Sequence, residues 1–171
     1  MKENIKGRRI VRKHSLADYE LEHAFSIIKS NMINLGFNVS KKDKEFWCDN
    51  LKNNLEKENF YFYLVYLDGE IVGFIELTNA DNSFIVSEIQ LDDKVKHTKI
   101  ILEIIKYLLN SPELAHQNEV YFSILKNNSI SNKTFSHLGG EIIFENEKKY
   151  KYIIKRELVE SFISRLKNKV N

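Results

Sequence analysis

The chain of 171 residues contains one cysteine, Cys48, one proline, Pro112, and one tryptophan, Trp47. A single cysteine excludes an internal disulfide and fits a reducing compartment. No apolar run approaches the ~18 residues of a membrane span, and the first residues, Met-Lys-Glu-Asn-Ile-Lys, lack the apolar segment of a secretory signal. These absences predict a cytoplasmic protein.

An excess of charge of one sign is also missing, because the net charge is only +2. We therefore expect neither a nucleic-acid partner nor a membrane-surface partner. The five histidines lack the mutual spacing and the cysteine partners of a zinc site, so no metal is predicted. Hydrophobic residues make up 43% of the chain and charged residues 29%, which is typical of a globular protein with a full core.

The pattern of apolar residues predicts alternating strands and helices. Asp68-Gly69 between two apolar runs is a strong hairpin signal. The expected elements are a strand at 8–13, a helix opened by a Ser15-Leu-Ala-Asp18 capping box, a helix at 41–57, strands at 60–67, 70–78 and 83–91, a helix ending near Pro112, a strand at 120–125, a helix ended by Gly139-Gly140, a hairpin within 141–154 and a C-terminal helix at 157–170.

One spacing in this pattern carries functional information. Asn128, at a strand-to-helix turn, is followed by Ser131, Phe135 and Gly139 at offsets three, seven and eleven. This spacing resembles the second cofactor motif of the Gcn5-related N-acetyltransferases (GNAT). The order of elements resembles that family over about residues 8–155, with the C-terminal helix outside the resemblance.

The resemblance implies one α/β domain spanning residues 1–171. Its strongly twisted mixed sheet would be splayed between the fourth and fifth strands, with helices on both faces. It also implies acetyl-CoA as cosubstrate, bound in the V-shaped opening, and transfer of an acetyl or other acyl group to an amine by direct attack.

The family binds the cofactor's diphosphate at the junction of the fourth strand and the following helix, with a Gln/Arg-x-x-Gly-x-Gly/Ala motif. In this chain Lys96 falls on the first position, and Lys99 and Ile101 fall on the two glycines. A register two residues earlier uses Lys94, His97 and Lys99 instead. Neither register contains a glycine, so crowding of the main chain opposes the charge that the lysines supply.

The predicted cofactor contacts come from three segments. The first turn of the helix would offer main-chain N–H groups, Thr98 could cap it, and the fourth strand would hold the pantetheine and polarise the thioester carbonyl. Asn128 would contact the cofactor or merely cap its own helix, and Asn132 is expected to face solvent. The full set is Ile89, Gln90, Leu91, Lys96, His97, Thr98, Lys99, Ile100, Ile101, Leu102, Asn128 and Phe135.

A catalytic base would be a carboxylate with a raised pKa among apolar neighbours. Glu88 in the fourth strand is the first candidate and Glu76 in the third is the second, and either could instead be a solvated strand-end glutamate. Phe135 occupies the position where the family often places a tyrosine acid, and phenylalanine cannot donate a proton. Tyr121 is a substitute acid or a core residue.

Three functions therefore stay open on the sequence alone. The first is an N-acetyltransferase acting on a small-molecule or peptide amine. The second is a catalytically inactive binding module on the same fold, which the missing glycines favour. The third is an interaction protein that forms a homodimer through the helix at 157–170, whose apolar stripe could equally pack on its own domain.

Overall fold

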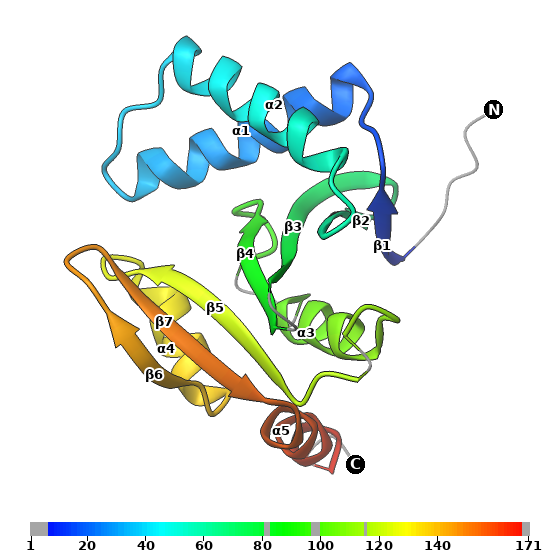
Figure 1. The fold of residues 1–171 in the computed structure, drawn as a ribbon, viewed down its shortest axis with the longest axis vertical. Helices are drawn as coiled ribbons and strands as arrows, with labels where there is room; N and C mark the ends of the chain where they lie inside the picture. The colour runs from blue at the N-terminus through cyan, green and yellow to red at the C-terminus, as the bar shows by residue number, and fades with distance from the viewer. Residues whose placement is uncertain (1–6, 81–82, 97–99, 115, 169–171) are drawn as a thin grey trace. The chain divides into compact units, whose positions relative to one another are not determined.

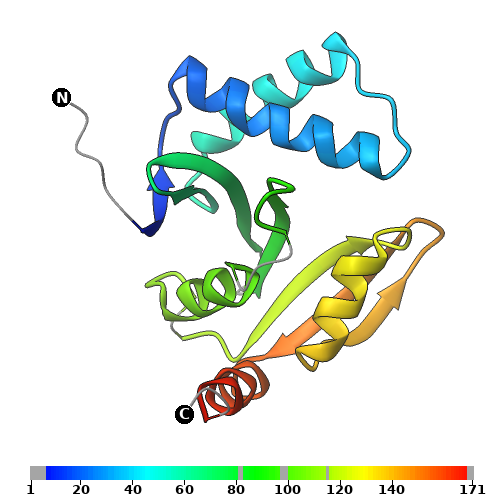
Figure 2. The same ribbon diagram turned by 180° about the vertical axis from the view of Figure 1, so that it is seen from behind.

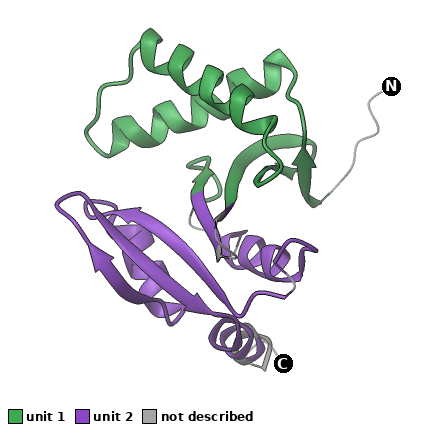
Figure 3. Cartoon of the chain, viewed as in Figure 1, with its two compact units in different colours: residues 1–78, 88–98 green, residues 79–87, 99–171 purple. Residues whose placement is uncertain are grey.

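The computed structural model describes residues 7–80, 83–96, 100–114 and 116–168 (Figure 1). The chain divides into two compact units, shown in Figure 3, one of residues 1–78 and 88–98 and the other of residues 79–87 and 99–171. That both units act as one domain stays a prediction.

The helices and strands follow the predicted order closely. Among the described residues, no helix combines the length and apolar character that crossing a membrane requires. The elements are β1 (Arg8–Lys13), α1 (Asp18–Asn34), α2 (Lys41–Leu55), β2 (Phe60–Leu67), β3 (Glu70–Ala80), β4 (Ser83–Leu91), α3 (Ile100–Asn110), β5 (Glu119–Leu125), α4 (Ser129–His137), β6 (Glu141–Glu145), β7 (Lys149–Lys155) and α5 (Arg156–Asn168).

The strands form a mixed sheet in the order β1-β2-β3-β4-β5-β7-β6. β4 and β5 pair in parallel, through Phe84–Val86 and Val120–Phe122, whereas β1 with β2, β2 with β3, and β7 with both its neighbours are antiparallel. The predicted α/β fold with a mixed sheet is thus confirmed. The splay between β4 and β5 concerns the placement of the two units and stays a prediction.

In the first unit, α1 and α2 lie side by side and cover β2 and β3 (Figures 1 and 2). The Trp47 ring lies 5.8 Å from that of Phe25 and 5.7 Å from that of Phe74, so it joins both helices to the sheet. Aromatic pairs at such distances stabilise a core beyond the area they bury. The other buried side chains of this core include Leu21, Ala24, Ile27, Ile28, Leu51, Phe60, Phe62, Leu64 and Ile71.

The start of α1 differs from the prediction. The helix begins at Asp18 with Ala17 as its N-cap, so the capping box at Ser15 is wrong. Glu20 takes over the role, because its Oε2 accepts a hydrogen bond from the Ala17 N–H at 2.9 Å. Glu20 is only 3% exposed and also accepts hydrogen bonds from Lys13 Nζ at 2.8 Å and from the Tyr66 hydroxyl at 3.0 Å. Contacts with β1 and β2, which no local pattern encodes, thus fix the first turn.

Glu20→Gln should destabilise the protein by about 2 kcal/mol at pH 7, because hydrogen bonds to a charged group are lost. Burial raises the pKa of Glu20, but the hydrogen bonds from Lys13, Ala17 and Tyr66 outweigh it and leave the pKa lowered. A lowered carboxyl pKa stabilises the fold above the unfolded value of 4.5, and this contribution disappears as the pH falls. Urea unfolding at pH 7 and pH 3 measures both effects. Glu22→Gln, on the exposed side of α1, should change stability by less than about 0.5 kcal/mol.

The Asp68-Gly69 hairpin is confirmed. Asp68 has φ 50° and Gly69 has φ 86°, which are the two positive φ angles that a tight turn between antiparallel strands of this twist requires.

Gly73 allows β3 to approach the end of β4 closely. A Cβ at this position would lie 2.5 Å from the Gln90 carbonyl oxygen and 2.7 Å from Leu91 Cδ2. Gly73→Ala should therefore lower the unfolding free energy by about 1–3 kcal/mol, because main-chain atoms must move. Gly69→Ala is the comparison, since its Cβ would meet nothing within 4 Å and only its positive φ should cost about 1 kcal/mol. A Gly73→Ala variant no less stable than Gly69→Ala would contradict the close approach.

In the second unit, α4 lies against the sheet of β5, β7 and β6, as Figure 2 shows. The start of α5 packs on α3 and β7, where Val159 is fully buried. The Arg156 guanidinium donates hydrogen bonds to the carbonyls of Leu109, Leu114 and Gln117. α5 therefore packs on its own unit over this stretch.

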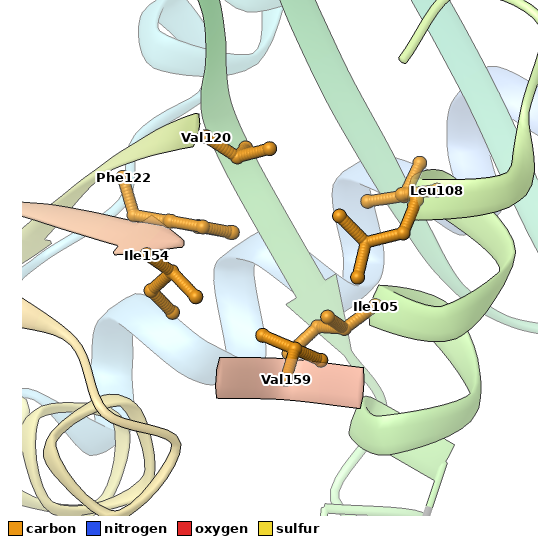
Figure 4. Close-up of a pocket in the computed structure, with 7 residues that line it drawn as sticks. Ile105, Leu108, Val120, Phe122, Ile154 and Val159 are labelled. Carbon is orange, nitrogen blue, oxygen red and sulfur yellow. The ribbon is translucent and has the colours of Figure 1, made fainter. Parts of the chain in front are cut away.

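A small apolar cavity lies between α3, β5, β7 and α5 (Figure 4). Its volume of about 10 Å³ is too small for a ligand. Its lining residues are Ile105, Leu108, Leu109, Val120, Phe122, Ile154 and Val159.

Candidate active site

Two carboxylates meet on neighbouring strands of the first unit. The Asp92 N–H donates to the Val72 carbonyl at 2.8 Å, which sets the antiparallel register of β3 and β4. Carried four residues along each strand, that register places Glu76 beside Glu88. Both residues are half-buried.

The electrostatics of Glu76 are unusual for a glutamate. Burial, and then the negative charge of Glu88, raise the pKa of Glu76 to about 8. Like charges on neighbouring carboxyl groups disfavour ionisation of both at once, so the pair holds one proton near neutral pH. A carboxyl group with this pKa suits a general base.

Two side-chain amides connect Glu88 to α1. Gln90 Nε2 donates to Glu88 Oε1 at 2.6 Å, and Asn31 Nδ2 donates to Gln90 Oε1 at 2.6 Å. Asn31 Nδ2 also donates to the Leu91 carbonyl at 3.1 Å. Neither Asn31 nor the side chain of Gln90 was singled out from the sequence for this role, because only the fold brings α1 to β4.

The end of α1 also holds the loop that follows β4. Ser30 and Asn34 donate to Asp93 Oδ2 at 3.3 and 3.0 Å. Asp93 pairs in turn with Lys96 at 2.5 Å, and Lys94 pairs with Glu70 at 2.7 Å. Surface ion pairs of this kind contribute only about 0–1 kcal/mol, so both lysines can exchange their partner for a bound anion.

The predicted cofactor segments are described in part. His97, Thr98 and Lys99 lie outside the described residues. α3 begins at Ile100, so Ile100, Ile101 and Leu102 form its first turn. Ile89, Gln90 and Leu91 form the end of β4. That these segments bind a diphosphate stays a prediction.

Asn128 caps α4, because its Oδ1 accepts from the Ser131 N–H at 3.1 Å. A cofactor contact through Asn128 stays a prediction. The expectation that Asn132 faces solvent is wrong. Asn132 is half-buried, its Nδ2 donates to the carbonyls of Leu125 and Asn128 at 2.9 Å, and its Oδ1 accepts from the Tyr152 hydroxyl at 3.0 Å.

Phe135 and Tyr121 lie on different faces of the second unit's sheet. Phe135 is 5% exposed, and its ring lies 4.5 Å from that of Phe122 and 6.3 Å from that of Tyr152. It therefore has little surface left for a cofactor. Tyr121 is half-exposed, its hydroxyl donates to Glu119 at 3.3 Å, and burial followed by the charge of Glu119 raises its pKa. Its role as an acid stays a prediction.

Compared with models of protein families and with curated proteins, the chain matches none. Solved structures do match. The N-acetyltransferase PseH of Campylobacter jejuni is 21% identical with a TM-score of 0.63, covering 87% of this chain and 98% of that one. It has also been solved with acetyl coenzyme A.

Two further structures are similar. FdhC, described as a nucleotide-linked sugar GNAT, is 16% identical with a TM-score of 0.65, covering 94% of each chain. The PaiA N-acetyltransferase of Thermoplasma acidophilum, solved with coenzyme A, is 18% identical with a TM-score of 0.62, covering 86% of this chain and 99% of that one. The chain thus has the fold of the GNAT acetyltransferases, which confirms the predicted fold.

Proposed function

We propose that this protein is an acetyl-CoA-dependent N-acetyltransferase in which Glu76, beside Glu88, removes the proton from the acceptor amine. The observation that carries the proposal is the carboxyl pair on β3 and β4, with a pKa of about 8 at Glu76. The GNAT fold supports the proposal by analogy. It does so by analogy only, because one fold can host several functions.

The chemistry required of the chain is proton removal. An ammonium group cannot attack a carbonyl until it loses a proton, and ionised Glu76 would accept that proton. When bound, acetyl-CoA would supply the acetyl group as a thioester, whose C–S bond breaks as the N–C bond forms. The thiolate is a fair leaving group without a proton donor, because a thiol has a pKa of about 8.5. This removes the need for an acid at Phe135.

The residues that would hold the cosubstrate are those of the three predicted segments. Lys94 and Lys96 would supply charge to the diphosphate, and the first turn of α3 would supply N–H groups. The end of β4 would bind the pantetheine, with Asn128 as a further contact. Both units would then act as one catalytic domain.

The acceptor would be a small-molecule or peptide amine. FdhC, described as a nucleotide-linked sugar GNAT, suggests an amino sugar as one class of acceptor to include. The rival function, an inactive binding module, is favoured by the absence of glycine between Leu91 and Leu102 and by the buried Phe135.

Thermal unfolding with and without acetyl-CoA tests the proposal first. A ligand at 100 times its dissociation constant adds about 2.7 kcal/mol to the unfolding free energy, so the melting temperature should rise by several degrees. Release of free CoA thiol, scanned over polyamines, amino sugars and peptides, then identifies the acceptor. If millimolar acetyl-CoA gives no thermal stabilisation and no calorimetric heat, catalysis is refuted and the binding module is favoured.

A further inference from the structure

The orientation of each side-chain amide between α1 and β4 follows from one main-chain group. A carbonyl oxygen can only accept a hydrogen bond, so the Leu91 carbonyl, 3.1 Å from Asn31, requires Asn31 to present its NH₂ group. The reversed orientation would place two acceptor oxygens against each other. Asn31 is 8% exposed, and its buried Oδ1 makes no hydrogen bond within the described part of the chain. The amide is therefore held by its donors alone.

This orientation is passed along to the carboxyl pair. Because Asn31 Nδ2 donates to Gln90 at 2.6 Å, Gln90 must present its Oε1 to α1. Gln90 then presents its Nε2 to Glu88 and donates at 2.6 Å. A fixed donor favours the ionised form of a carboxyl group, so charge is stabilised on Glu88 rather than on its neighbour.

We propose that Asn31 and Gln90 are positioning residues that assign the charge of the carboxyl pair to Glu88 and the proton to Glu76. The neighbours of Glu76 agree with this assignment. Burial and the charge of Glu88 are the causes that raise the Glu76 pKa, and Phe62 pairs with Glu76 across β2 and β3. The geometry of this inference is independent of the proposed function, but its consequence for catalysis rests on that function. The relay makes Glu76, rather than Glu88, the group whose ionisation controls the rate.

Carbon NMR of protein labelled at the glutamate carboxyl carbons tests the assignment without any substrate. Spectra of Glu76→Gln and Glu88→Gln identify the two resonances. In the unmodified protein, Glu76 should titrate near pH 8. In Gln90→Leu the Glu88 midpoint should rise by about one pH unit, since the hydrogen bond that favours its charged form is lost. Part of the Glu76 ionisation should then move to lower pH, because the two carboxyl groups share the proton more evenly.

Asn31→Leu should also raise the Glu88 midpoint, because Gln90 is then free to turn its NH₂ group away from Glu88. Asn34→Leu is the matched control, since Asn34 lies one turn further along α1 and bonds Asp93 instead. In Asn34→Leu the midpoints of Glu76 and Glu88 should not move. If Asn31→Leu fails to fold, Gln90→Leu alone carries the test. A Glu88 midpoint unchanged in Gln90→Leu would overturn the proposal.

Once an acceptor is known, the pH dependence of kcat/KM gives a second readout that a merely structural role would not move. In Gln90→Leu part of the rise in kcat/KM should move to lower pH, because Glu76 is already ionised in the molecules whose proton lies on Glu88. NMR midpoints that move as expected in a protein without transferase activity would support the assignment and reject the proposed function. Transferase activity together with unmoved NMR midpoints would support the proposed function and reject the assignment.

Discussion

Glu76→Gln should lower kcat/KM by about 10²- to 10⁴-fold, because glutamine cannot accept the amine proton. In the unmodified protein, kcat/KM should rise with pH and level off above about pH 8, as Glu76 ionises. The variant should lose this rise. The measurement is thiol release with the identified acceptor between pH 6 and pH 9.5. Glu45→Gln, an exposed carboxylate on α2, is the matched control and should retain full activity.

The same variant should be more stable than the unmodified protein at alkaline pH. The folded-state pKa of Glu76, about 8, lies above the usual value of 4.5, so between these values the folded state holds a proton that the unfolded state has released. Unfolding free energy therefore falls as the pH rises through this window. Glu76→Gln should gain about 1–3 kcal/mol over the unmodified protein at pH 9 and nothing near pH 4.

Urea unfolding at the two pH values measures this difference. A variant that loses activity and gains stability at pH 9 would show that the buried carboxyl group is kept at a cost to the fold. A variant whose activity and stability both match the unmodified protein would remove Glu76 from the proposed mechanism.

Phe135→Ala should lower the unfolding free energy by about 3–5 kcal/mol, because the buried ring packs against Phe122 of β5 and Tyr152 of β7. The ring contacts Phe122 at 4.5 Å, and its loss would leave a cavity that neighbouring aromatic rings cannot fill. Ile130→Ala in the same helix is the matched control. Ile130 is 58% exposed, so its truncation should change stability by less than about 0.5 kcal/mol. Denaturant unfolding followed by circular dichroism compares the two.

Phe135→Tyr separates a packing role from a catalytic one. The family often has a tyrosine at this position, but here the hydroxyl would enter a buried site. The variant should therefore lose about 1–3 kcal/mol of stability without a gain in kcat. A marked rise in kcat would show that the position faces the thioester after all.

The strands and most helices could be predicted from the sequence, because their apolar patterns are local. Asp68-Gly69 fixed a hairpin through its φ angles, and the apolar run of β2 required burial. The start of α1 could not be predicted in this way. Ser15 and Asp18 have the spacing of a capping box, but the helix start is fixed by Glu20 instead. Glu20 is held by Lys13 on β1 and by Tyr66 on β2, which lies 46 residues further along the chain.

The candidate site divides in the same manner. Glu76 and Glu88 could be selected as carboxylates within apolar strands, although which of them would bear the raised pKa could not be judged. The raised pKa depends on burial and on the charge of Glu88. Gln90, which donates to Glu88, is itself held by Asn31, 59 residues earlier in the chain. Asn132 was misjudged for a similar reason, since its bonds to Leu125 and Tyr152 exist only once β5, α4 and β7 have packed.

By itself, then, the sequence determined the order of the elements and the fold they build, because the periodicity of apolar residues and the turn residues act over a few positions. Only the tertiary structure decided that burial and the charge of Glu88 raise the pKa of Glu76, and that Phe135 belongs to the core. Burial, hydrogen-bond direction and the repulsion of like charges depend on distances between segments that are far apart in the chain.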